Sequence, residues 1–333
     1  MSRGDGLAVL DAAGVEALLP MEDAIRVVAK VMARMALGDV RQSPRSRMDL
    51  PGMGRLLGMM PGFIDEPACF GIKVATAFPG NAAAGLPSHC GAVLLFDADH
   101  GAPVALFDAG AITAIRTAAA SAVATDALAR PDASHLAVLG SGEQARRHVE
   151  AMCLIRPVTH LSVWGRSADK VARFGAEMAE GHGIAVAPCA TVAGAVEQAD
   201  IICTTTSATD PILTGGLLPA GVHVNIVGAS FPQQREVDGA VLARGQLYVD
   251  HRPSALALGG DIQAGLRDGL IGEGDIRAEI GAILAGKAEG RTTADQITLY
   301  KSVGVVAQDL AVAAHLLARV ATAPPTIVQR LRM

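Results

Sequence analysis

The chain has 333 residues, of which half are hydrophobic and 18% are charged, so it is long enough to form two domains with packed cores. The net charge of −5 and the aromatic content of 3% provide no basic or base-stacking surface for nucleic acid. No sustained apolar segment marks a signal peptide or a membrane helix. These properties argue against nucleic-acid and membrane partners and indicate a compact globular protein.

The cysteines are scattered along the chain and odd in number, and none of them forms a CxxC pair. This pattern predicts reduced, mostly buried thiols in a cytoplasmic protein, with neither a disulfide framework nor a metal site. The five cysteines are Cys69, Cys90, Cys153, Cys189 and Cys203.

The first part of the chain predicts one helix followed by short strands. The helix begins after Pro20, with two acids in its first turn, and ends at Gly38. A basic loop covers residues 43–48, and the segment 97–101 is typical of a hairpin turn. Four strands are expected to form an antiparallel sheet in an α+β domain, over residues 56–60, 70–78, 92–96 and 103–107.

The second part of the chain alternates strands and helices. An alanine-rich helix over residues 112–128 is expected to connect the two parts. Alternation from residue 135 to about residue 248 predicts an α/β fold with a doubly wound parallel sheet of the Rossmann type. Beyond its first βαβ unit, the expected elements are strands at 184–187, 201–205, 222–227, 247–249 and 297–300, a helix near 193–198, and a final helix over 302–321.

The strongest functional pattern lies in the segment 135–167. An apolar run ends at Leu139, a glycine turn follows, a helix reaches about Leu154, and a second apolar run ends at Trp164. This order is typical of the βαβ unit that binds the pyrophosphate of a dinucleotide at a helix N-terminus. The expected cofactor-binding residues of the turn are Gly140, Ser141, Gly142, Glu143, Gln144 and Ala145.

The end of the second strand indicates which dinucleotide binds. Units that bind NAD usually carry a carboxylate about 20 residues beyond the glycine turn, where it accepts a hydrogen bond from the ribose 2′-OH. This chain has Arg166 and Ser167 at that place. A guanidinium and a hydroxyl suit a 2′-phosphate, so NADPH is favoured and NADH stays possible. A solvated surface arginine is the alternative.

Three cations of the first part could hold an anionic substrate. Lys73 stands in the middle of an apolar strand, and Arg116 lies near the start of an apolar helix. Arg45 lies in the basic loop. Buried cations need partners, and together these three suit a carboxylate. The alternative is that Lys73 and Arg116 pair with structural acids such as Asp97 or Asp108.

Two further side chains are candidates for proton transfer. His89 lies in a glycine-rich loop before a strand, and Ser230 follows the strand at 222–227. In a doubly wound sheet the carboxyl ends of the strands meet the ligand, which favours Ser230 as a site residue. Both residues can equally be ordinary loop side chains. The sequence contains no GxSxG, HExxH or Walker motif, which argues against hydrolases and kinases.

These features together resemble the ornithine cyclodeaminase/mu-crystallin family over nearly the whole chain. The Ile112–Ser121 block and the glycine turn are the most specific matches. The matching segments are Pro44-Arg45, Met60-Pro61, Gly71-Ile-Lys73, Phe78-Pro-Gly-Asn81, Gly85-Leu-Pro87, Leu94-Leu-Phe-Asp97, Ile112–Ser121, Leu136–Ala145, Val227-Gly228, Arg235-Glu236, Ile297–Ser302 and Gly304.

The resemblance implies a homodimer in which the first domains pair their sheets. It implies a substrate-binding and dimerisation domain over residues 1–115 together with 302–333, and an NAD(P)-binding Rossmann domain over 116–301. By motif position, Arg45, Lys73 and Arg116 would hold the substrate carboxylate. Thr117 would lie near the cofactor's phosphates.

Two departures from the family's cyclodeaminases bear on the substrate. Those enzymes carry an aspartate where this chain has Ser230, and a glutamate before the Met-Pro pair where this chain has the segment 57–59, Leu-Gly-Met. A substrate with a second ammonium group would lack both anions, which is costly in a dry pocket. The sequence therefore argues against ornithine as substrate.

We expect an NADPH-dependent reductase that converts Δ1-pyrroline-2-carboxylate to L-proline, with Δ1-piperideine-2-carboxylate, which gives L-pipecolate, as a second substrate. Lys73, or His89 through a water held by Ser230, would keep the imine protonated. The alternatives are an ornithine cyclodeaminase, an alanine-dehydrogenase-like enzyme, and a protein that stores a nucleotide or small ligand without catalysis.

Overall fold

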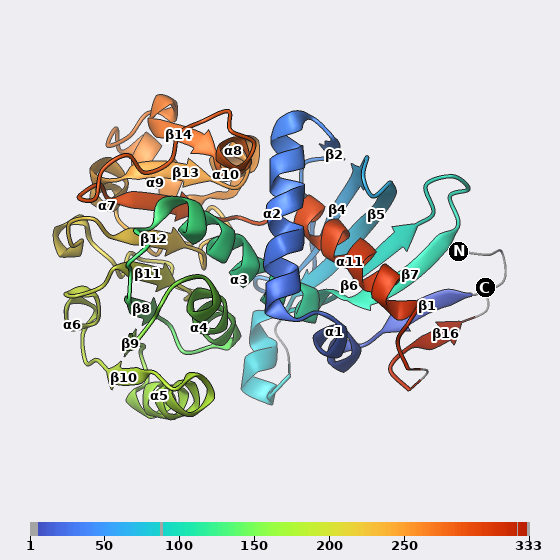
Figure 1. Cartoon of the computed structure of the whole chain (residues 1–333), viewed down its shortest axis with the longest axis horizontal. Coiled ribbons are helices and arrows are strands. Elements are labelled where there is room, and N and C mark those ends of the chain that lie inside the picture. Colours follow the sequence, from blue (N-terminus) through green and yellow to red (C-terminus); the bar gives the residue numbers. More distant parts are fainter. Residues whose placement is uncertain (1–5, 87–88, 325, 332–333) are drawn as a thin grey trace. The chain divides into compact units, whose positions relative to one another are not determined.

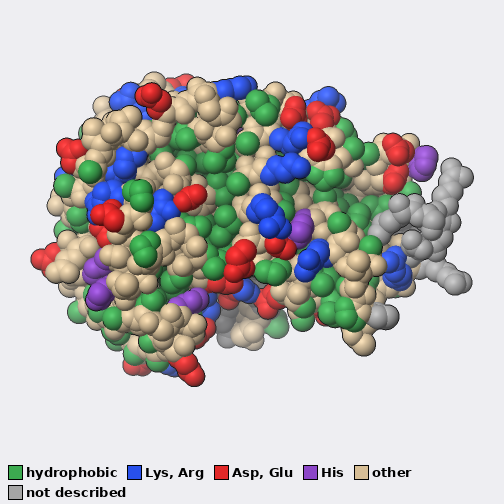
Figure 2. Space-filling model, in the orientation of Figure 1, with side chains coloured by type: hydrophobic (Ala, Val, Ile, Leu, Met, Phe, Trp, Pro, Cys, Tyr) green, Lys and Arg blue, Asp and Glu red, His purple; other side chains and the backbone are tan. Residues whose placement is uncertain are grey.

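The structure, a computed structural model, describes residues 6–86, 89–324 and 326–331. The chain divides into two compact units (Figure 1). Unit 1 comprises the chain up to Arg116 and again from Val305 onward, and unit 2 comprises Thr117–Gly304. None of the described helices is both long and apolar enough to cross a membrane. Figure 2 shows basic and acidic side chains interspersed over the visible face.

Unit 1 is built on one eight-stranded sheet, in the order β16-β1-β7-β6-β5-β4-β2, with β3 paired to β4. The long central strands follow one another by hairpins, including the expected turn at 97–101, and pair antiparallel. The strands are β1 Leu7–Leu10, β2 Val40–Gln42, β3 Ser46–Asp49, β4 Leu56–Ile64, β5 Cys69–Ala77, β6 His89–Phe96, β7 Pro103–Asp108 and β16 Gln329–Leu331.

The expected antiparallel sheet is correct for these central strands, but β1 lies parallel to β7. Two helices, α1 (Ala12–Leu18) and α2 (Met21–Leu37), separate β1 from the next strand, so no hairpin forces β1 to run antiparallel to its neighbour. The α2 helix carries two acids in its first turn and ends at Gly38 with φ 92°, as its sequence predicts.

The final helix, α11 (Val306–Val320), packs against α2 and the sheet (Figure 1). Two glycines permit this close approach. A Cβ atom at Gly71 would lie 2.3 Å from Leu94 O and 2.9 Å from Leu310 Cδ2, and one at Gly62 would lie 2.8 Å from Val306 Cγ1. Because Gly62 on β4 and Gly71 on β5 have no side chain, α11 packs directly on the strand that carries Lys73.

Unit 2 contains an eight-stranded sheet in the order β10-β9-β8-β11-β12-β15-β13-β14, and every pair in it is parallel. This confirms the expected α/β class with a parallel Rossmann-type sheet. Its strands are β8 His135–Leu139, β9 His160–Trp164, β10 Ala185–Pro188, β11 Ile201–Thr204, β12 His223–Ile226, β13 Gln246–Val249, β14 Ile276–Glu279 and β15 Thr298–Lys301.

Helices between these strands pack against the sheet. The connecting helix α3 continues from unit 1 into unit 2 and is longer than its sequence pattern indicated. The helices are α3 Ala109–Leu128, α4 Glu143–Ile155, α5 Ala168–His182, α6 Val192–Val196, α7 Gly239–Arg244, α8 Arg252–Leu258, α9 Gly260–Arg267 and α10 Ile280–Leu284.

Two buried histidines of unit 2 predict acid sensitivity. Burial lowers the pKa of His148 to about 4 and that of His223 to about 3, although each ring is hydrogen-bonded. Unfolded histidine titrates near 6.5, so both side chains contribute stability that is present above about pH 6.5 and is lost as the pH falls toward 4. Each histidine should lower the free energy of unfolding by about 1.4 kcal/mol for each pH unit within that range.

Denaturant unfolding measured from about pH 7 down to about pH 5 tests this expectation. The variant His223→Gln should show a shallower loss of unfolding free energy with falling pH than the parent. Replacing the exposed His100 at the β6–β7 turn should leave the slope unchanged. Equal slopes for the parent and His223→Gln would contradict the expectation.

Candidate functional site

The glycine turn of unit 2 leaves the N-terminus of α4 open. Gly140 follows β8 with φ 131°, and a Cβ there would lie 2.7 Å from Thr205 Oγ1, so only glycine fits. Gly142 is the N-cap of α4 and offers no side-chain cap; no atom lies within 4 Å of a Cβ built on it. The free N–H groups of the helix therefore face open space, which suits a phosphate group.

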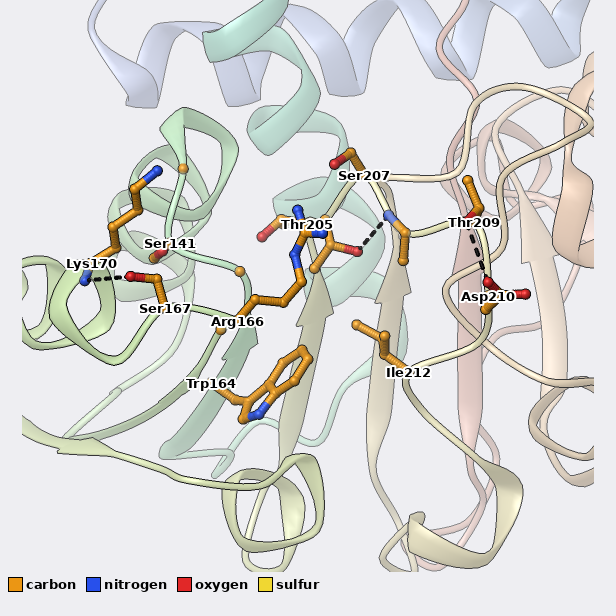
Figure 3. A pocket seen from close by; sticks show the side chains of 15 residues that line it. Ser141, Trp164, Arg166, Ser167, Lys170, Thr205, Ser207, Thr209, Asp210 and Ile212 are labelled. Carbon is orange, nitrogen blue, oxygen red and sulfur yellow. Dashed lines mark hydrogen bonds between the residues drawn. The ribbon is translucent and has the colours of Figure 1, made fainter. Parts of the chain in front are cut away.

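A cavity of about 500 Å³ opens beside this turn (Figure 3). Its walls come from the ends of β8, β9 and β11 and carry mostly glycines, hydroxyls and two cations. The lining residues are Gly140, Ser141, Gly142, Trp164, Gly165, Arg166, Ser167, Lys170, Thr205, Thr206, Ser207, Ala208, Thr209, Asp210 and Ile212. The carboxyl ends of parallel strands thus form the pocket, as expected for a doubly wound sheet.

Arg166 and Ser167 lie together in this pocket, directly after β9 (Figure 3). Ser167 is the N-cap of α5, and its Oγ accepts a hydrogen bond from Lys170 N at 3.4 Å. Arg166 is exposed and has no hydrogen bond or ion pair among the described residues. Lys170, which no sequence pattern marked as a site residue, lines the same pocket. The absence of a structural partner leaves the Arg166 guanidinium available for a ligand.

The remaining residues of the glycine turn serve the helix. The Glu143 carboxylate accepts a hydrogen bond from Arg147 Nε at 2.9 Å, and Ala145 is fully buried. The Gln144 Oε1 atom is buried without a hydrogen bond among the described residues. Thr117, on α3, is 8% exposed. None of these four residues is among those that line the pocket.

The far wall of the pocket is the loop 205–210 after β11, which its sequence pattern did not mark as part of a site. Its one available signal was a run of hydroxyl residues directly after an apolar strand. The buried carboxylate of Glu236 fixes this loop. It accepts hydrogen bonds from Thr206 N and Thr206 Oγ1, at 2.6 and 2.7 Å, and from Gly228 N at 2.6 Å. The loops that follow β11 and β12 are thereby joined.

Unit 1 contains a buried cluster of opposite charges. Lys73, on β5, is 6% exposed, and Arg116, on α3, is 5% exposed. Both contact one oxygen of Asp309 on α11, which is fully buried: Lys73 Nζ lies 2.8 Å and Arg116 Nε 3.1 Å from Asp309 Oδ1. The neighbouring Gln308 accepts a hydrogen bond from Arg116 Nη1 at 3.1 Å through Oε1.

The acid that pairs with these cations was not foreseen. Asp97 and Asp108, the expected structural partners, are engaged elsewhere: Asp97 accepts hydrogen bonds from backbone N–H groups of the hairpin turn, and Asp108 accepts from Ala111 N at the start of α3. The alternative that Lys73 and Arg116 pair with a structural acid is therefore correct, but that acid is neither Asp97 nor Asp108. Asp309 takes this position because α11 returns across the sheet of unit 1.

The cluster carries an excess of positive charge. The pKa of Lys73 is lowered to about 8: burial is the largest cause, the charges of Arg116 and Arg45 add to it, and the attraction of Asp309 opposes it. Burial would raise the pKa of Asp309, but the charges of and hydrogen bonds from Arg116 and Lys73 outweigh it, so the pKa is lowered. Lys73 and Arg116 share one carboxylate, which leaves one positive charge in excess. A monoanionic ligand suits such a site.

The structure places the other candidates as follows. Arg45 is half-buried immediately before β3. His89 begins β6 opposite Ala77, but its side chain, like Pro87 and Ser88, lies outside the described part of the chain. Ser230 is half-buried in the loop after β12, where its N–H donates to Gln234 Oε1 at 3.3 Å. Unit 1 thus brings together Lys73, Arg116 and Arg45.

Comparison with known proteins identifies the family that the chain resembles. The model of the ornithine cyclodeaminase/mu-crystallin family matches residues 7–323. The ketimine reductase mu-crystallin of Mus musculus is 36% identical over 276 residues, which are 83% of this chain and 84% of that protein.

Solved structures of similar fold match nearly the whole chain. The structure of Thermococcus litoralis Δ1-pyrroline-2-carboxylate reductase in complex with NADH and L-proline has a TM-score of 0.94 at 31% identity and covers 98% of this chain and 100% of its own. An archaeal alanine dehydrogenase dimer with bound NAD has a TM-score of 0.92 at 27% identity, and the match covers 98% of this chain and 99% of that chain.

Proposed function

The chain belongs to the ornithine cyclodeaminase/mu-crystallin family, and on that basis we propose that it is an NADPH-dependent reductase of cyclic ketimine carboxylates, converting Δ1-pyrroline-2-carboxylate to L-proline. The observation that carries this proposal is the buried cluster of unit 1, in which Lys73 and Arg116 share the single carboxylate of Asp309 and so exceed it by one positive charge. Such a site selects a carboxylate. Δ1-Piperideine-2-carboxylate, which gives L-pipecolate, carries the same group and is the second proposed substrate.

The nucleotide pocket of unit 2 would hold the cofactor. Its open helix N-terminus suits the pyrophosphate. Arg166, which has no partner in the part of the chain that the structure describes, suits the 2′-phosphate of NADPH together with Ser167 and Lys170. We assign Thr117 to the phosphates by motif position. When bound, the cofactor supplies the hydride that adds to the imine carbon. The reaction consumes one imine, one NADPH and one proton.

The protein's own residues would orient the substrate and manage that proton. Fixing the carboxylate between Lys73, Arg116 and Arg45 sets the position of the adjacent imine carbon, and such positioning is the main contribution a protein makes to hydride transfer. A pKa of about 8 allows Lys73 to hold a proton at neutral pH and to release it to a nearby nitrogen. His89 and a water held by Ser230 are the alternative route for the proton.

The structure disfavours ornithine cyclodeamination. Ornithine brings a second ammonium group, which needs an anion. The segment 57–59, within β4, offers none, and Ser230 stands where cyclodeaminases have an aspartate. The buried acid of unit 1, Asp309, already contacts two cations. An ammonium without a partner would be costly to bury.

A comparison of substrates tests the proposal. We expect NADPH oxidation with Δ1-pyrroline-2-carboxylate and Δ1-piperideine-2-carboxylate. We expect no ammonia from L-ornithine with NAD, and little turnover of pyruvate with ammonia. Ammonia from ornithine would establish a cyclodeaminase, and preferred turnover of pyruvate an alanine-dehydrogenase-like enzyme. Tight NADPH binding without turnover of any imine would indicate the storage function.

We also propose that the enzyme is a cytoplasmic homodimer that buries the second face of the unit 1 sheet. Gly71 and Lys73 face α11, so alternate residues of β5 lie on the opposite face. Ile72 and Leu94, paired across β5 and β6, are partly exposed there. The free cysteines, including the exposed Cys90, fit a reducing compartment.

Charges placed on this face should separate the dimer. The double variant Ile72→Glu, Leu94→Glu would bring like charges into an apolar interface, and we expect the dimer dissociation constant to rise by about 1,000-fold or more. Sedimentation velocity measures this change. The variant Leu37→Glu, at an exposed position on α2, is the matched control. A parent that sediments as a monomer, or a double variant that stays dimeric, would contradict the proposal.

A further inference from the structure

We propose that Asp309 is a positioning residue of the substrate site: through its single oxygen Oδ1 it holds the Lys73 ammonium group against the Arg116 guanidinium and keeps the proton on Lys73. This inference rests on the proposed function, because it assigns Asp309 a role in the site that receives the substrate carboxylate.

The Asp309 carboxylate contacts both cations through one of its oxygens. Asp309 is fully buried, and its Oδ1 contacts both cations, at 2.8 and 3.1 Å, while Oδ2 has no hydrogen bond among the described residues. The two cations repel each other, and the anion that both contact offsets this repulsion. One oxygen therefore fixes two cations at the same time.

The surrounding groups show that Asp309 has no substitute. Lys73 also donates to Thr113 Oγ1 on α3 at 2.5 Å, which is a neutral partner. The other charged groups near Lys73 are Arg116 on α3 and Arg45 before β3, and both oppose its protonation. Asp309 on α11 is the only anion that acts on Lys73 in this part of the described chain.

The helix that carries Asp309 is itself fixed. Gly62 and Gly71 let α11 rest on β4 and β5 through Val306 and Leu310, which flank Asp309 in the sequence. The carboxylate thus sits on a rigid element. This arrangement is what a site needs to hold ionic groups in one geometry before the substrate binds.

The variant Asp309→Asn tests the proposal, because it keeps the shape of the side chain and removes its charge. The chain has five lysines, so NMR of protein carrying nitrogen-15 at the lysine side chains can follow Lys73 without any substrate. We expect the Lys73 pKa to fall by roughly 1 to 3 pH units in the variant. The alkaline limb of the kcat/KM profile should move to lower pH by a similar interval.

Steady-state kinetics separate positioning from simple loss of structure. Below the shifted pKa, the variant site holds more positive charge, so KM for the imine should stay level or fall while kcat drops about 10- to 100-fold. Asp309→Glu should restore the pH profile in part. Asp23 on α2 pairs with His315, which lies on α11 as Asp309 does. The control Asp23→Asn removes this carboxylate and should leave the Lys73 titration unchanged.

An unchanged Lys73 titration in Asp309→Asn would overturn the inference, and so would a pH profile that superimposes on that of the parent. If Asp309→Asn fails to fold, the same measurements on Asp309→Ser, which also removes the charge, decide: a lowered Lys73 pKa supports the inference, and an unchanged one overturns it. The NMR titration needs no turnover, so it distinguishes a wrong role for Asp309 from a parent that reduces no ketimine.

Discussion

Replacing Arg116 with alanine should lower kcat/KM for Δ1-pyrroline-2-carboxylate by about 100- to 1,000-fold. The guanidinium is 5% exposed and contacts Asp309 and Gln308, so its fork is fixed in place. Losing a buried, charge-assisted partner of a carboxylate costs about 2 to 5 kcal/mol, and each 1.4 kcal/mol is a tenfold change. Arg116→Lys should recover little, because an ammonium cannot reproduce the two-pronged geometry.

Steady-state kinetics with varied imine and saturating NADPH measure this effect. Most of the loss of activity should appear at imine concentrations well below KM, where binding of the substrate carboxylate limits the rate. The dissociation constant of NADPH should stay within about twofold of the parent's. Arg26→Ala, which removes an exposed arginine on α2, is the matched control. If Arg116→Ala retains near-parental activity in a folded protein, the assignment of the carboxylate site is wrong.

Replacing Arg166 with glutamate should reverse the preference between the two cofactors. The guanidinium has no partner among the described residues and lines the nucleotide pocket, so its charge is available for a 2′-phosphate. A charge-assisted hydrogen bond is worth about 1.5 to 3 kcal/mol, and a carboxylate in its place repels the phosphate. We expect the ratio of kcat/KM for NADPH to that for NADH to fall about 100-fold or more, while NADH use is retained because a carboxylate accepts from the ribose 2′-OH.

The exposed Arg173 on α5 provides the control for this prediction. Arg173→Glu makes the same change of charge on the same helix outside the residues that line the pocket, so it should leave the ratio unchanged. A parent enzyme that prefers NADH, or an unchanged ratio in Arg166→Glu, would show that Arg166 does not contact the cofactor.

The nucleotide pocket was predictable because its signals are local. Gly140 and Gly142 lie between a strand and a helix of clear periodicity, and Arg166 follows the next strand. The pattern is contained in about 30 residues, so sequence spacing alone places these groups at one edge of a parallel sheet. The loop at 205–210 was missed because hydroxyl residues after a strand are common in ordinary loops.

The cation cluster was predictable only in part. Lys73 and Arg116 were conspicuous because each places a charge within an apolar pattern. Nothing in the sequence, however, identifies the acid that forms ion pairs with them. Asp309 lies 236 residues beyond Lys73, in a helix whose apolar spacing suggests core packing. Acids nearer in the sequence, such as Asp108, were the natural candidates. Only the return of α11 to unit 1 brings the true partner into contact.

The strands that escaped prediction are short and depend on their neighbours. β1 has four residues and β16 has three, and they pair with each other although they lie at opposite ends of the described chain. A strand of three or four residues is too short to show a reliable alternation of apolar and polar residues. Its pairing is therefore decided by the sheet that it joins. The helices α8 and α9 likewise lack the length that makes a helical pattern visible.

The decisive measurement is the fate of the hydride. The purified protein is incubated with Δ1-pyrroline-2-carboxylate and NADPH that carries deuterium at the transferable position of C4, and the product is analysed by mass spectrometry and NMR. A ketimine reductase gives L-proline with one deuterium at Cα and an equal amount of NADP⁺. Absence of labelled proline, in a protein that binds NADPH, would contradict the proposed reaction and leave the cation cluster to serve a different carboxylate.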